Sequence, residues 1–463
     1  MTFATANLVF DPQIIQRFDI NGPRYTSYPT ADRFSTALDA EAYKDWLGRR
    51  NSVPDRPLSL YFHIPFCNTI CYYCGCNKII TKDHGRSAKY IKYLARDMEL
   101  QGRYLAGDRD VVQLHFGGGT PTFLSNDEMR TLMAHIRQNF NLLDGGEYSI
   151  EVDPRKVDAA TVAVLGEVGF NRMSLGVQDF DPAVQKAVNR IQSEEETLDV
   201  VRAARANGFL SISIDLIYGL PHQSVASFDR TLDRVIAASP DRLAVYNYAH
   251  LPQLFMPQRR INPADVPSPD QRLAILALAI RKLTDAGYVF IGMDHFAKPD
   301  DELAIAQRER RLHRNFQGYS THAECDLLGF GISSIGKVDP TYAQNVKTLD
   351  EYYERLDHGV LPVFRGIVLN DDDLLRRAVI TDLMCHFEIS FAATEARHGI
   401  DFKRYFATEL IDLKELEAGG LVKVDADSIT VLPPGRLLVR AVAMVFDAHL
   451  RADRERKRYS KVI

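Results

Sequence analysis

Apolar residues follow two alternating periods from residue 58 to about residue 300. Segments with apolar residues at helical spacing separate short apolar runs that are typical of β-strands. The expected strands are LSLYFHI (58–64), VVQLHF (111–116), EYSIEV (147–152), RMSLGV (172–177), SISIDLIY (211–218), RLAVYNY (242–248) and YVFIGM (288–293). The expected helices between them are Ala88–Tyr104, Asn126–Asn139, Ala159–Val168, Glu194–Asn207 and Ser227–Ala238. Repeated β–α units predict an α/β fold, with a parallel sheet covered by helices and curled into a full or partial barrel.

The remaining segments predict smaller parts around this barrel. An N-terminal extension, 1–51, holds short helices at 11–18 and 39–50 around the turn-rich NGPRYTSYPTADRF, which suits either a plain wrap or a flap over a polar ligand. The barrel is expected over 52–300, and a turn-rich connection that completes the site over 301–365. Residues 366–463 predict a small, mainly helical domain, with a strand and turn at SITVLPPG and a last helix from Arg436 to about Arg454.

Composition narrows the class of protein. The chain of 463 residues is too long for one simple core, and its 46% hydrophobic and 25% charged residues are ordinary for a globular protein. Its net charge of −5 gives no sign of nucleic-acid binding. No signal peptide and no membrane span are indicated, and the six cysteines do not resemble a disulfide framework. We therefore expect a cytoplasmic protein with reduced thiols.

Four cysteines are packed into the segment directly after the first expected strand. Cys67, Cys71 and Cys74 have three and then two residues between them, and Cys76 follows. Three thiolates on one short loop bind soft iron or zinc, but a structural zinc site needs four ligands and no second cysteine pair is present. Cubane iron–sulfur clusters are normally held by four thiolates, so three would leave one iron open for a small molecule. A chance spacing of half-buried cysteines is the alternative.

Glycines and carboxylates follow the next strands, at the edge where such barrels carry their chemistry. In HFGGGTPT, the glycines at 117–119 let the backbone approach a ligand. The alternatives are a plain tight turn or a phosphate-binding loop, but the lysine that a phosphate-binding loop requires does not follow. Glu151 and Asp153 end the next strand, where they suit a ribose or an ammonium group or are simply solvated acids. Asp215 lies inside an apolar strand and must find a donor or a ligand.

Read together, these segments resemble the oxygen-independent coproporphyrinogen III oxidases, a family of the radical S-adenosylmethionine (SAM) superfamily. The aromatic residue before the third cysteine is typical of the superfamily's cluster loop. The resemblance covers nearly the whole chain, through GPRYTSYPTA, LYFHIPFCNTICYYCGCNKI, HFGGGTPT, IEVDPR, NRMSLGVQDF, VNRIQ, IDLIYGLP, NYAHLP, GMDHFA and HRNFQGY. It implies a partial (β/α) parallel barrel of radical SAM type with an N-terminal extension and a small C-terminal helical domain.

The resemblance also implies roles for individual residues. A 4Fe–4S cluster would be ligated by Cys67, Cys71 and Cys74 but not by Cys76, with SAM on its fourth iron. That SAM would be contacted by Tyr61, Tyr73, Gly118, Glu151, Ala249 and Ile335. A second SAM would be lined by Gly119, Thr120, Gln178, Arg190 and Asp215. The sequence itself supports all of these residues except Ile335 as positions at the mouth of the barrel. It places Ile335 beyond the barrel, in a glycine-rich turn.

The activity implied is oxidative decarboxylation of two propionates of coproporphyrinogen III to vinyl groups, which gives protoporphyrinogen IX in haem biosynthesis. Its partners would be this substrate, a low-potential electron donor and an unknown final electron acceptor, and we expect a monomer. A haem-binding, chaperone-like relative is the nearest alternative, but the Gly75-Cys76 pair and the GPRYTSYPTA segment favour the enzyme. The other alternative is a plain electron-transfer iron–sulfur protein. The glycine turn and the polar residues at the strand ends argue against it.

Overall fold

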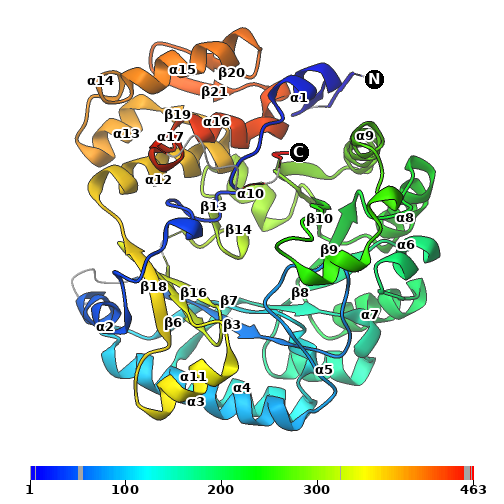
Figure 1. The fold of residues 1–463 in the computed structure, drawn as a ribbon, viewed down its shortest axis with the longest axis vertical. Helices are drawn as coiled ribbons and strands as arrows, with labels where there is room; N and C mark the ends of the chain where they lie inside the picture. Colours follow the sequence, from blue (N-terminus) through cyan, green and yellow to red (C-terminus); the bar gives the residue numbers. More distant parts are fainter. Residues whose placement is uncertain (1, 6, 51–55, 324, 453–458, 460) are drawn as a thin grey trace. The chain divides into compact units, whose positions relative to one another are not determined.

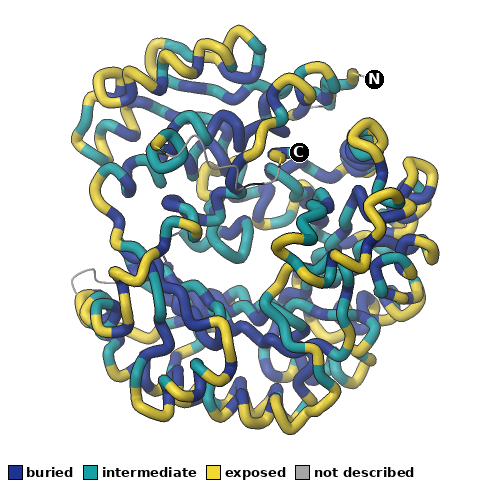
Figure 2. Tube along the Cα trace, viewed as in Figure 1, coloured by how far each residue is buried: buried dark blue, intermediate teal, exposed yellow. Residues whose placement is uncertain are grey.

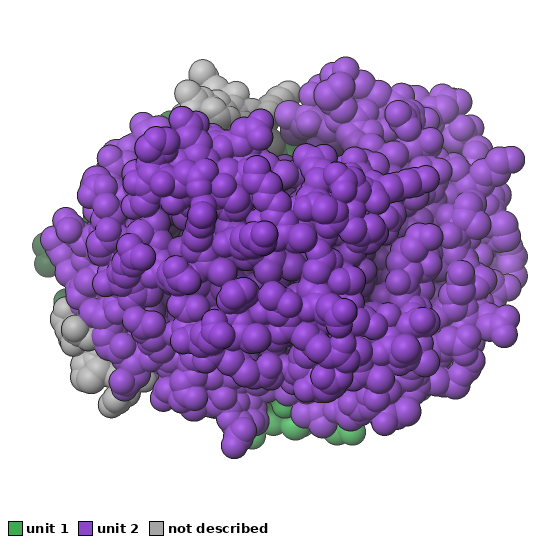
Figure 3. Space-filling model, turned by 90° about the horizontal axis from the view of Figure 1, so that it is seen from below, with its two compact units in different colours: residues 1–33, 276–323, 369–463 green, residues 34–275, 324–368 purple. Residues whose placement is uncertain are grey.

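The protein was analysed as a computed structural model that describes residues 2–5, 7–50, 56–323, 325–452, 459 and 461–463. Its contacts divide the chain into two compact units (Figure 3). Unit 1 comprises residues 1–33, 276–323 and 369–463, and unit 2 comprises residues 34–275 and 324–368. The four consecutive segments expected from the sequence stay a prediction, and their first boundary, at 51 and 52, lies outside the described residues.

Unit 2 is built on one mostly parallel sheet. Its strands are β3 Leu58–Ile64, β6 Asp110–Gly118, β7 Asn141–Val152, β8 Arg172–Gln178, β9 Ser211–Tyr218, β10 Arg242–Asn247, β15 Asp326–Phe330, β16 Ile335–Val338, β17 Thr341–Asn345 and β18 Val363–Val368. They run in the order β10-β9-β8-β7-β6-β3-β15-β16-β17-β18. Every neighbouring pair from β10 to β15 is parallel, whereas β15 to β18 form an antiparallel extension. The expected parallel sheet is confirmed.

Helices cover the outer side of this sheet (Figure 1). The helical segments of unit 2 are α2 Ala40–Arg49, α3 Gly85–Tyr104, η3 Pro121–Phe123, α4 Asn126–Asn139, η4 Pro154–Lys156, α5 Ala159–Glu167, α6 Pro182–Ala187, α7 Glu194–Ala206, α8 Val225–Ala238, η5 Met256–Arg260, η6 Pro263–Asp265 and α11 Leu349–Asp357. Helix α9 Pro269–Asp285 runs across the boundary of the units. The strands are largely buried, while the outward sides of the helices are exposed (Figure 2).

Local sequence signals explain where the covering helices begin. Ser125 and Glu128 form a reciprocal capping box at the start of α4, and Ser193 and Glu196 do the same for α7. Each pair satisfies backbone N–H groups that would otherwise have no partner in the first turn. These caps begin two of the helices that cover the sheet.

Aromatic packing joins the sheet to its covering layer. The Phe62 ring on β3 stacks on Phe330 of β15 at a centroid distance of 4.8 Å and tilts against Phe116 of β6 at 5.2 Å. Phe116 in turn meets Phe170, edge to face, at 5.1 Å. All four side chains are buried. Such contacts fix the strand ends that carry the site.

Unit 1 holds the expected small helical domain together with the chain's N-terminal segment. Its elements are β1 Phe3–Ala4, β2 Val9–Phe10, α1 Pro12–Phe18, η1 Ala31–Arg33, β11 Val289–Gly292, β12 His295–Ala297, α10 Glu302–Arg308, β13 His313–Asn315, β14 Gly318–Ser320, α12 Asp371–His386, β19 Glu388–Ser390, α13 Phe391–His398, α14 Phe402–Tyr405, α15 Ala407–Ala418, β20 Val422–Val424, β21 Ser428–Val431, η7 Pro433–Leu438, α16 Val439–Val445 and α17 Ala448–Ala452.

Two expectations about unit 1 were wrong. The run YVFIGM does not add a parallel strand, because Met293 and Asp294 turn the chain directly from β11 into the antiparallel strand β12. A connection this short permits only antiparallel pairing. The last helix is not continuous, since Asp447 interrupts it and accepts a hydrogen bond from the Leu450 N–H to begin α17. Its expected end near Arg454 lies outside the described residues.

The segment considered as a flap uses two of its hydroxyl groups inside unit 1. Tyr25 donates to Asp447 at 3.0 Å, and the Tyr28 hydroxyl accepts a hydrogen bond from the Ala448 N–H at 3.1 Å. Both tyrosines are buried. These two hydroxyl groups therefore hold the N-terminal segment to α17 and to the residue before it, while the flap itself stays a prediction. In the part of the chain that the structure describes, no helix is long and apolar enough to cross a membrane.

Candidate active site

The cysteine loop leaves β3 and is fixed at both ends by backbone hydrogen bonds. Its short strands β4 Phe66–Cys67 and β5 Ile79–Ile80 pair in parallel. The Thr81 N–H donates to the Cys67 carbonyl at 3.0 Å. In the middle of the loop, the Tyr72 N–H donates to the Val188 carbonyl at 2.9 Å. The loop is thus held at the carboxyl edge of the sheet.

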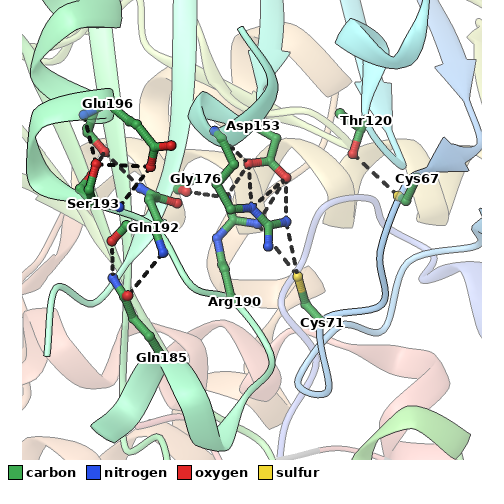
Figure 4. Close-up of polar contacts among 12 residues, drawn as sticks. Cys67, Cys71, Thr120, Asp153, Gly176, Gln185, Arg190, Gln192, Ser193 and Glu196 are labelled. Atoms are coloured by element: carbon green, nitrogen blue, oxygen red, sulfur yellow. Dashed lines mark hydrogen bonds and ion pairs between the residues drawn. The ribbon is translucent and has the colours of Figure 1, made fainter. Parts of the chain in front are cut away.

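Hydrogen-bond donors surround two of the three expected cluster ligands. The Thr120 hydroxyl donates to Cys67 Sγ at 3.4 Å, and Arg190 Nη1 donates to Cys71 Sγ at 3.6 Å (Figure 4). Cys67 is 8% exposed and Cys71 9%. Burial raises the pKa of the Cys67 thiol to about 11, although the Thr120 hydrogen bond lowers it. A positive metal centre would offset this cost, since it deprotonates a coordinating thiol outright.

The third expected ligand, Cys74, has a different environment. A hydrogen bond from Cys76 is the main cause that lowers the pKa of Cys74 to about 6, and Lys78 lowers it further against the effect of burial. The same hydrogen bond with Cys74 raises the pKa of the exposed Cys76. The hydrogen bond from Cys76 and the charge of Lys78 thus favour the thiolate form of Cys74.

The donor set fits a cluster better than a single ion. Within the described residues, no three His, Cys, Asp or Glu side chains gather closely enough to hold one metal ion. A zinc ion would draw its sulfur ligands to about 2.3 Å. A 4Fe–4S cluster binds its thiolates at separate corners, so three cysteines on one loop are a suitable donor set, and the Arg190 guanidinium beside Cys71 would offset negative charge there.

The glycine turn follows β6 and lies directly against the cysteine loop. The Gly119 N–H donates to the Ile64 carbonyl at 2.8 Å, and the Thr120 N–H donates to Phe66 at 2.9 Å. Gly118 has a φ of +112°, and a Cβ there would lie 2.6 Å from the His63 ring. A Cβ at Gly119 would lie 2.7 Å from the backbone of Pro65. The turn therefore requires glycine at both positions.

Glu151 accepts hydrogen bonds from two sides. The Gly118 N–H lies 3.2 Å from Glu151 Oε2, and His115 Nε2 lies 3.4 Å from Oε1. Burial would raise the pKa of this carboxyl, but the contacts with His115 and Gly118 hold it below its usual value. The Tyr61 ring stacks on His115 at 5.9 Å. Tyr61, Gly118 and Glu151, expected around one SAM, therefore surround a common region.

Arg190 is the centre of a polar cluster at the next strand ends (Figure 4). It lies three residues beyond α6 and bonds to the Gly176 carbonyl, to Cys71 and to Asp153, whose Oδ1 lies 3.3 Å from Nη2. A Cβ at Gly176 would lie 2.9 Å from Gln178 Nε2 and 3.1 Å from Arg190 Nη2. Gln178 and Arg190 thus lie side by side, and whether they line one ligand stays a prediction.

Asp215 finds the donor that its position in an apolar strand required. The Ser174 hydroxyl donates to Asp215 Oδ2 at 3.0 Å. Burial, reinforced by the charge of Glu151, raises the pKa of Asp215 to about 7. Asp215 is the register partner of Gly176, so it belongs to the strand ends that carry Arg190 and Gln178.

The remaining expected contacts come from three separate elements. Tyr73 packs against a buried cluster that includes Tyr248, the residue before Ala249. The expectation that Ile335 lies in a turn beyond the barrel was wrong, because Ile335 begins strand β16. Its carbonyl carbon would lie 3.0 Å from a Cβ at Gly329, which is the register partner of Tyr61. The antiparallel extension therefore returns Ile335 to the edge of β15 and, through it, toward Tyr61.

Some supporting residues had no recognisable signal in the sequence. Arg155 Nη2 lies 3.7 Å from Cys71 Sγ and also pairs with Asp153 at 2.5 Å. Asn189 donates to the Ile70 carbonyl at 2.7 Å, and Gln258 donates to the Tyr73 carbonyl at 3.0 Å. Only their nearness to the quoted motifs could have drawn attention to them. Together they fix the cysteine loop to the ends of later strands.

Two basic side chains that could in principle bind substrate carboxylates, those of Lys78 and Arg24, have internal partners. Lys78 Nζ donates to the Cys74 carbonyl at 2.9 Å, within the cysteine loop. Arg24 pairs with Asp294 inside unit 1. Neither contact favours a role in substrate binding.

Comparison with known proteins agrees with this geometry over almost the full chain. Residues 61–235 match the Radical SAM superfamily, and residues 369–438 match the HemN C-terminal domain. The oxygen-independent coproporphyrinogen III oxidase of Pseudomonas aeruginosa is 53% identical over 98% of this chain and 99% of its own length. The protein of the same name from Escherichia coli is 48% identical, with 98% of each chain covered.

A solved structure supports the fold. The Escherichia coli coproporphyrinogen III oxidase (HemN), described as a radical SAM enzyme, superposes with a TM-score of 0.91 at 48% identity. The superposition covers 96% of this chain and 100% of the other.

Proposed function

This chain belongs to the oxygen-independent coproporphyrinogen III oxidases of the radical SAM superfamily, and we propose that the strand ends of unit 2 carry out that reaction. It is a radical SAM oxidoreductase of haem biosynthesis, so the chaperone-like alternative is not favoured. The observation that carries the proposal is the convergence of the cysteine loop, the glycine turn and Glu151 at one edge of the sheet.

The residues of the chain would position the cofactors and the substrate and shield them from water, while the cofactors would supply the difficult chemistry. Cys67, Cys71 and Cys74 would hold the 4Fe–4S cluster that the superfamily implies. When bound, this cluster and SAM would supply the one-electron, 5′-deoxyadenosyl-radical chemistry that removes a hydrogen from the β carbon of a substrate propionate. Thr120 and Arg190 contact the cluster-side sulfurs and stabilise their negative charge.

Binding of the first SAM would use the backbone at Gly118 and the carboxylate of Glu151. A carboxylate whose pKa is held low stays ionised and can accept hydrogen bonds from the amino group or ribose of SAM. Tyr61, Tyr73, Ala249 and Ile335 would complete the contacts. Decarboxylation then releases CO2 and one further electron to an acceptor that is not yet identified, and it is repeated on a second propionate.

Further parts of the proposal concern the surroundings of the enzyme. Coproporphyrinogen III is the substrate that the relatives' name indicates. We place the protein in the cytoplasm, because its six cysteines are free and a low-potential cluster needs a reducing compartment. A monomer with a low-potential electron donor remains our expectation.

A direct test is anaerobic turnover by pure, reconstituted protein. With dithionite, SAM and coproporphyrinogen III, we expect protoporphyrinogen IX, CO2, methionine and 5′-deoxyadenosine. Product analysis by mass spectrometry decides the result. A protein that binds haem but neither cleaves SAM nor decarboxylates the porphyrinogen would support the chaperone-like alternative instead.

The second SAM is proposed beside Gly119, Thr120, Gln178, Arg190 and Asp215. Support comes from the convergence of Gln178 and Arg190 over Gly176, with Asp215 on the neighbouring strand. Arg190 also has acceptors within the protein, so its replacement would disturb Cys71 as well. Asp215 is the cleaner probe, because an asparagine there can still accept the Ser174 hydrogen bond.

We expect Asp215→Asn to weaken binding of the second SAM about ten- to a hundredfold, since losing a hydrogen bond to a charged group costs roughly 1.5–3 kcal/mol. The number of SAM molecules bound per cluster, measured by equilibrium dialysis, should fall from two toward one while iron content is unchanged. Asp199→Asn on the exposed side of α7 is the control. A wild-type protein that binds one SAM would return Asp215 to a structural role.

A further inference from the structure

Arg272 is a half-buried arginine of unit 2 whose side chain has no partner in the described part of the chain. Its Nε is enclosed by protein without a hydrogen-bond acceptor, and its terminal nitrogens form neither a hydrogen bond nor an ion pair with a described residue. A guanidinium keeps its positive charge, and withdrawing it from water without a counter-ion is costly. The contacts proposed for the two SAM molecules leave this side chain without a role.

The ends of two strands hold the Arg272 side chain in place. Just before it, in the first turn of α9, the Gln271 N–H donates to Ser268 Oγ at 3.3 Å and the Ser268 N–H donates to Gln271 Oε1 at 2.9 Å. A Cβ at Gly219, directly after β9, would lie 2.8 Å from Arg272 Cδ, so only glycine lets the arginine stem cross this strand end. The same Cβ would lie 3.5 Å from Oδ1 of Asn247, the last residue of β10.

Asn247 is a second polar group at this point that lacks a partner. Its Oδ1 is buried and accepts no hydrogen bond from any described residue, Arg272 included. Buried polar groups normally have partners, so two unsatisfied groups side by side indicate a ligand that interacts with both. A carboxylate accepts two hydrogen bonds from a guanidinium, and the Asn247 amide can turn so that its nitrogen donates to the same ligand.

The carboxylates near Arg272 along the chain keep their charge but do not contact it. Asp270 is exposed, and Asp265 Oδ2 lies 3.8 Å from His222 Nε2. Within the described residues, neither carboxylate forms an ion pair with Arg272. What favours an anion here is therefore the missing counter-ion of one guanidinium, whatever the net charge of the surrounding surface.

This place belongs to the same edge of the sheet as the candidate active site. Asn247 pairs in register with Tyr218, the last residue of β9, and Asp215 lies three residues earlier on that strand. At about 3.3 Å per residue, the end of β9 lies roughly 10 Å beyond Asp215. Tyr248, which follows Asn247, belongs to the buried cluster against which Tyr73 of the cysteine loop packs. A ligand held at the strand ends therefore extends toward the residues expected around SAM.

We propose that Arg272, together with the Asn247 amide, binds a propionate of coproporphyrinogen III that does not react. The substrate carries more propionates than the two that become vinyl groups, and those kept in the product are available as handles during the reaction. The ionised propionate pairs with the terminal nitrogens of Arg272 and accepts a hydrogen bond from Asn247, which orients the macrocycle along the strand ends. The inference rests on the proposed function, because it takes its ligand from that reaction.

Arg272→Gln in the holoenzyme is expected to bind coproporphyrin III, the stable oxidised form of the substrate, about tenfold to a hundredfold more weakly. Glutamine keeps an apolar stem over Gly219 but removes the charge. Quenching of the porphyrin fluorescence without oxygen measures the Kd. The KM for coproporphyrinogen III should rise in proportion, while iron content and SAM affinity stay at the wild-type values. Arg272→Lys should restore part of the affinity, because it restores the charge without the planar fork.

Asn247→Asp is an independent test, because it places a carboxylate beside the guanidinium. This carboxylate competes with the propionate, so coproporphyrin III should again bind about tenfold more weakly. The tetramethyl ester of coproporphyrin III has no charge to lose, and its affinity should be the same in the wild type and in both variants. A wild type that binds acid and ester equally well would contradict the proposal.

The matched control is Arg281→Gln, which makes the same change at an exposed position of α9. Equal coproporphyrin III affinity in the wild type and in Arg272→Gln would overturn the proposal. A fall in SAM affinity would assign the guanidinium to the carboxylate of SAM, and a loss of iron would give it a structural role, so either result also counts against it. A wild type that binds coproporphyrin III without turnover of coproporphyrinogen III would contradict the proposed function, while acid and ester binding would still decide the role of Arg272.

Discussion

Replacement of Cys67, Cys71 or Cys74 by alanine is expected to remove the 4Fe–4S cluster and with it all SAM cleavage. Only a thiolate binds cluster iron strongly, and the other cysteine that the structure describes on this loop, Cys76, is exposed. Loss of one ligand should leave far less than the wild-type iron and sulfide per chain. Metal and sulfide analysis, with the visible absorption of the reconstituted protein, measures the effect.

Cys76→Ala is the matched control, since Cys76 lies two residues from Cys74 but is exposed. It should keep the full iron content, although Cys76 hydrogen-bonds Cys74. Cys385→Ala tests whether loss of any buried thiol has the same effect. A Cys76 variant without iron, beside a Cys74 variant that keeps its iron, would overturn the ligand assignment.

Gly118→Ala is expected to abolish measurable SAM binding while the cluster remains. The backbone there has a φ of +112°, which costs roughly 1–3 kcal/mol for a residue other than glycine. The added Cβ would also lie 2.6 Å from the ring of His63, which cannot easily move because Tyr61 and the Asn77 carbonyl hold its two nitrogens. The turn must therefore shift, and the Gly118 N–H leaves Glu151. Calorimetric titration with SAM measures the loss.

Gly208→Ala separates backbone strain from the clash. Gly208 has a similar φ of +81°, but a Cβ there would meet nothing within 4 Å. It precedes β9 and so lies at the end of the sheet opposite the cysteine loop. This variant should lose some stability and keep its SAM affinity. Unchanged SAM affinity in Gly118→Ala would mean that the turn has only a structural role.

Several elements could be predicted from the sequence because their signals are local. The run LSLYFHI matches β3, and Asn126–Asn139 matches α4, whose capping box is visible in the sequence as Ser125 and Glu128. Alternating strands and helices implied parallel pairing, since a long connection must cross over the sheet. The C-terminal helices were less certain, as Asp447 shows, because a side chain that caps a new helix can also continue an old one.

The candidate site residues likewise divide into those with a local signal in the sequence and those placed only by the tertiary structure. Strand-end position alone predicted that Glu151 lies at the chemical edge. The cost of a buried charge predicted a partner for Asp215, and resemblance to a family added the roles of the cysteines and of Gln178. It was the tertiary structure that placed Ile335 on β16, beside the strand that pairs with Tyr61, because antiparallel pairing between β15 and β16 has no local signature.

By itself, the sequence determined the parallel α/β unit, the thiol spacing and the need for a partner at Asp215, because periodicity, ligand chemistry and the cost of a buried charge all act over a few residues. Only the tertiary structure decided what those groups meet. Arg155 and Arg190 reach Cys71 from separate loops, and the Arg272 stem crosses Gly219 beside Asn247. Such contacts depend on the order and register of strands, which are fixed by packing across the whole sheet.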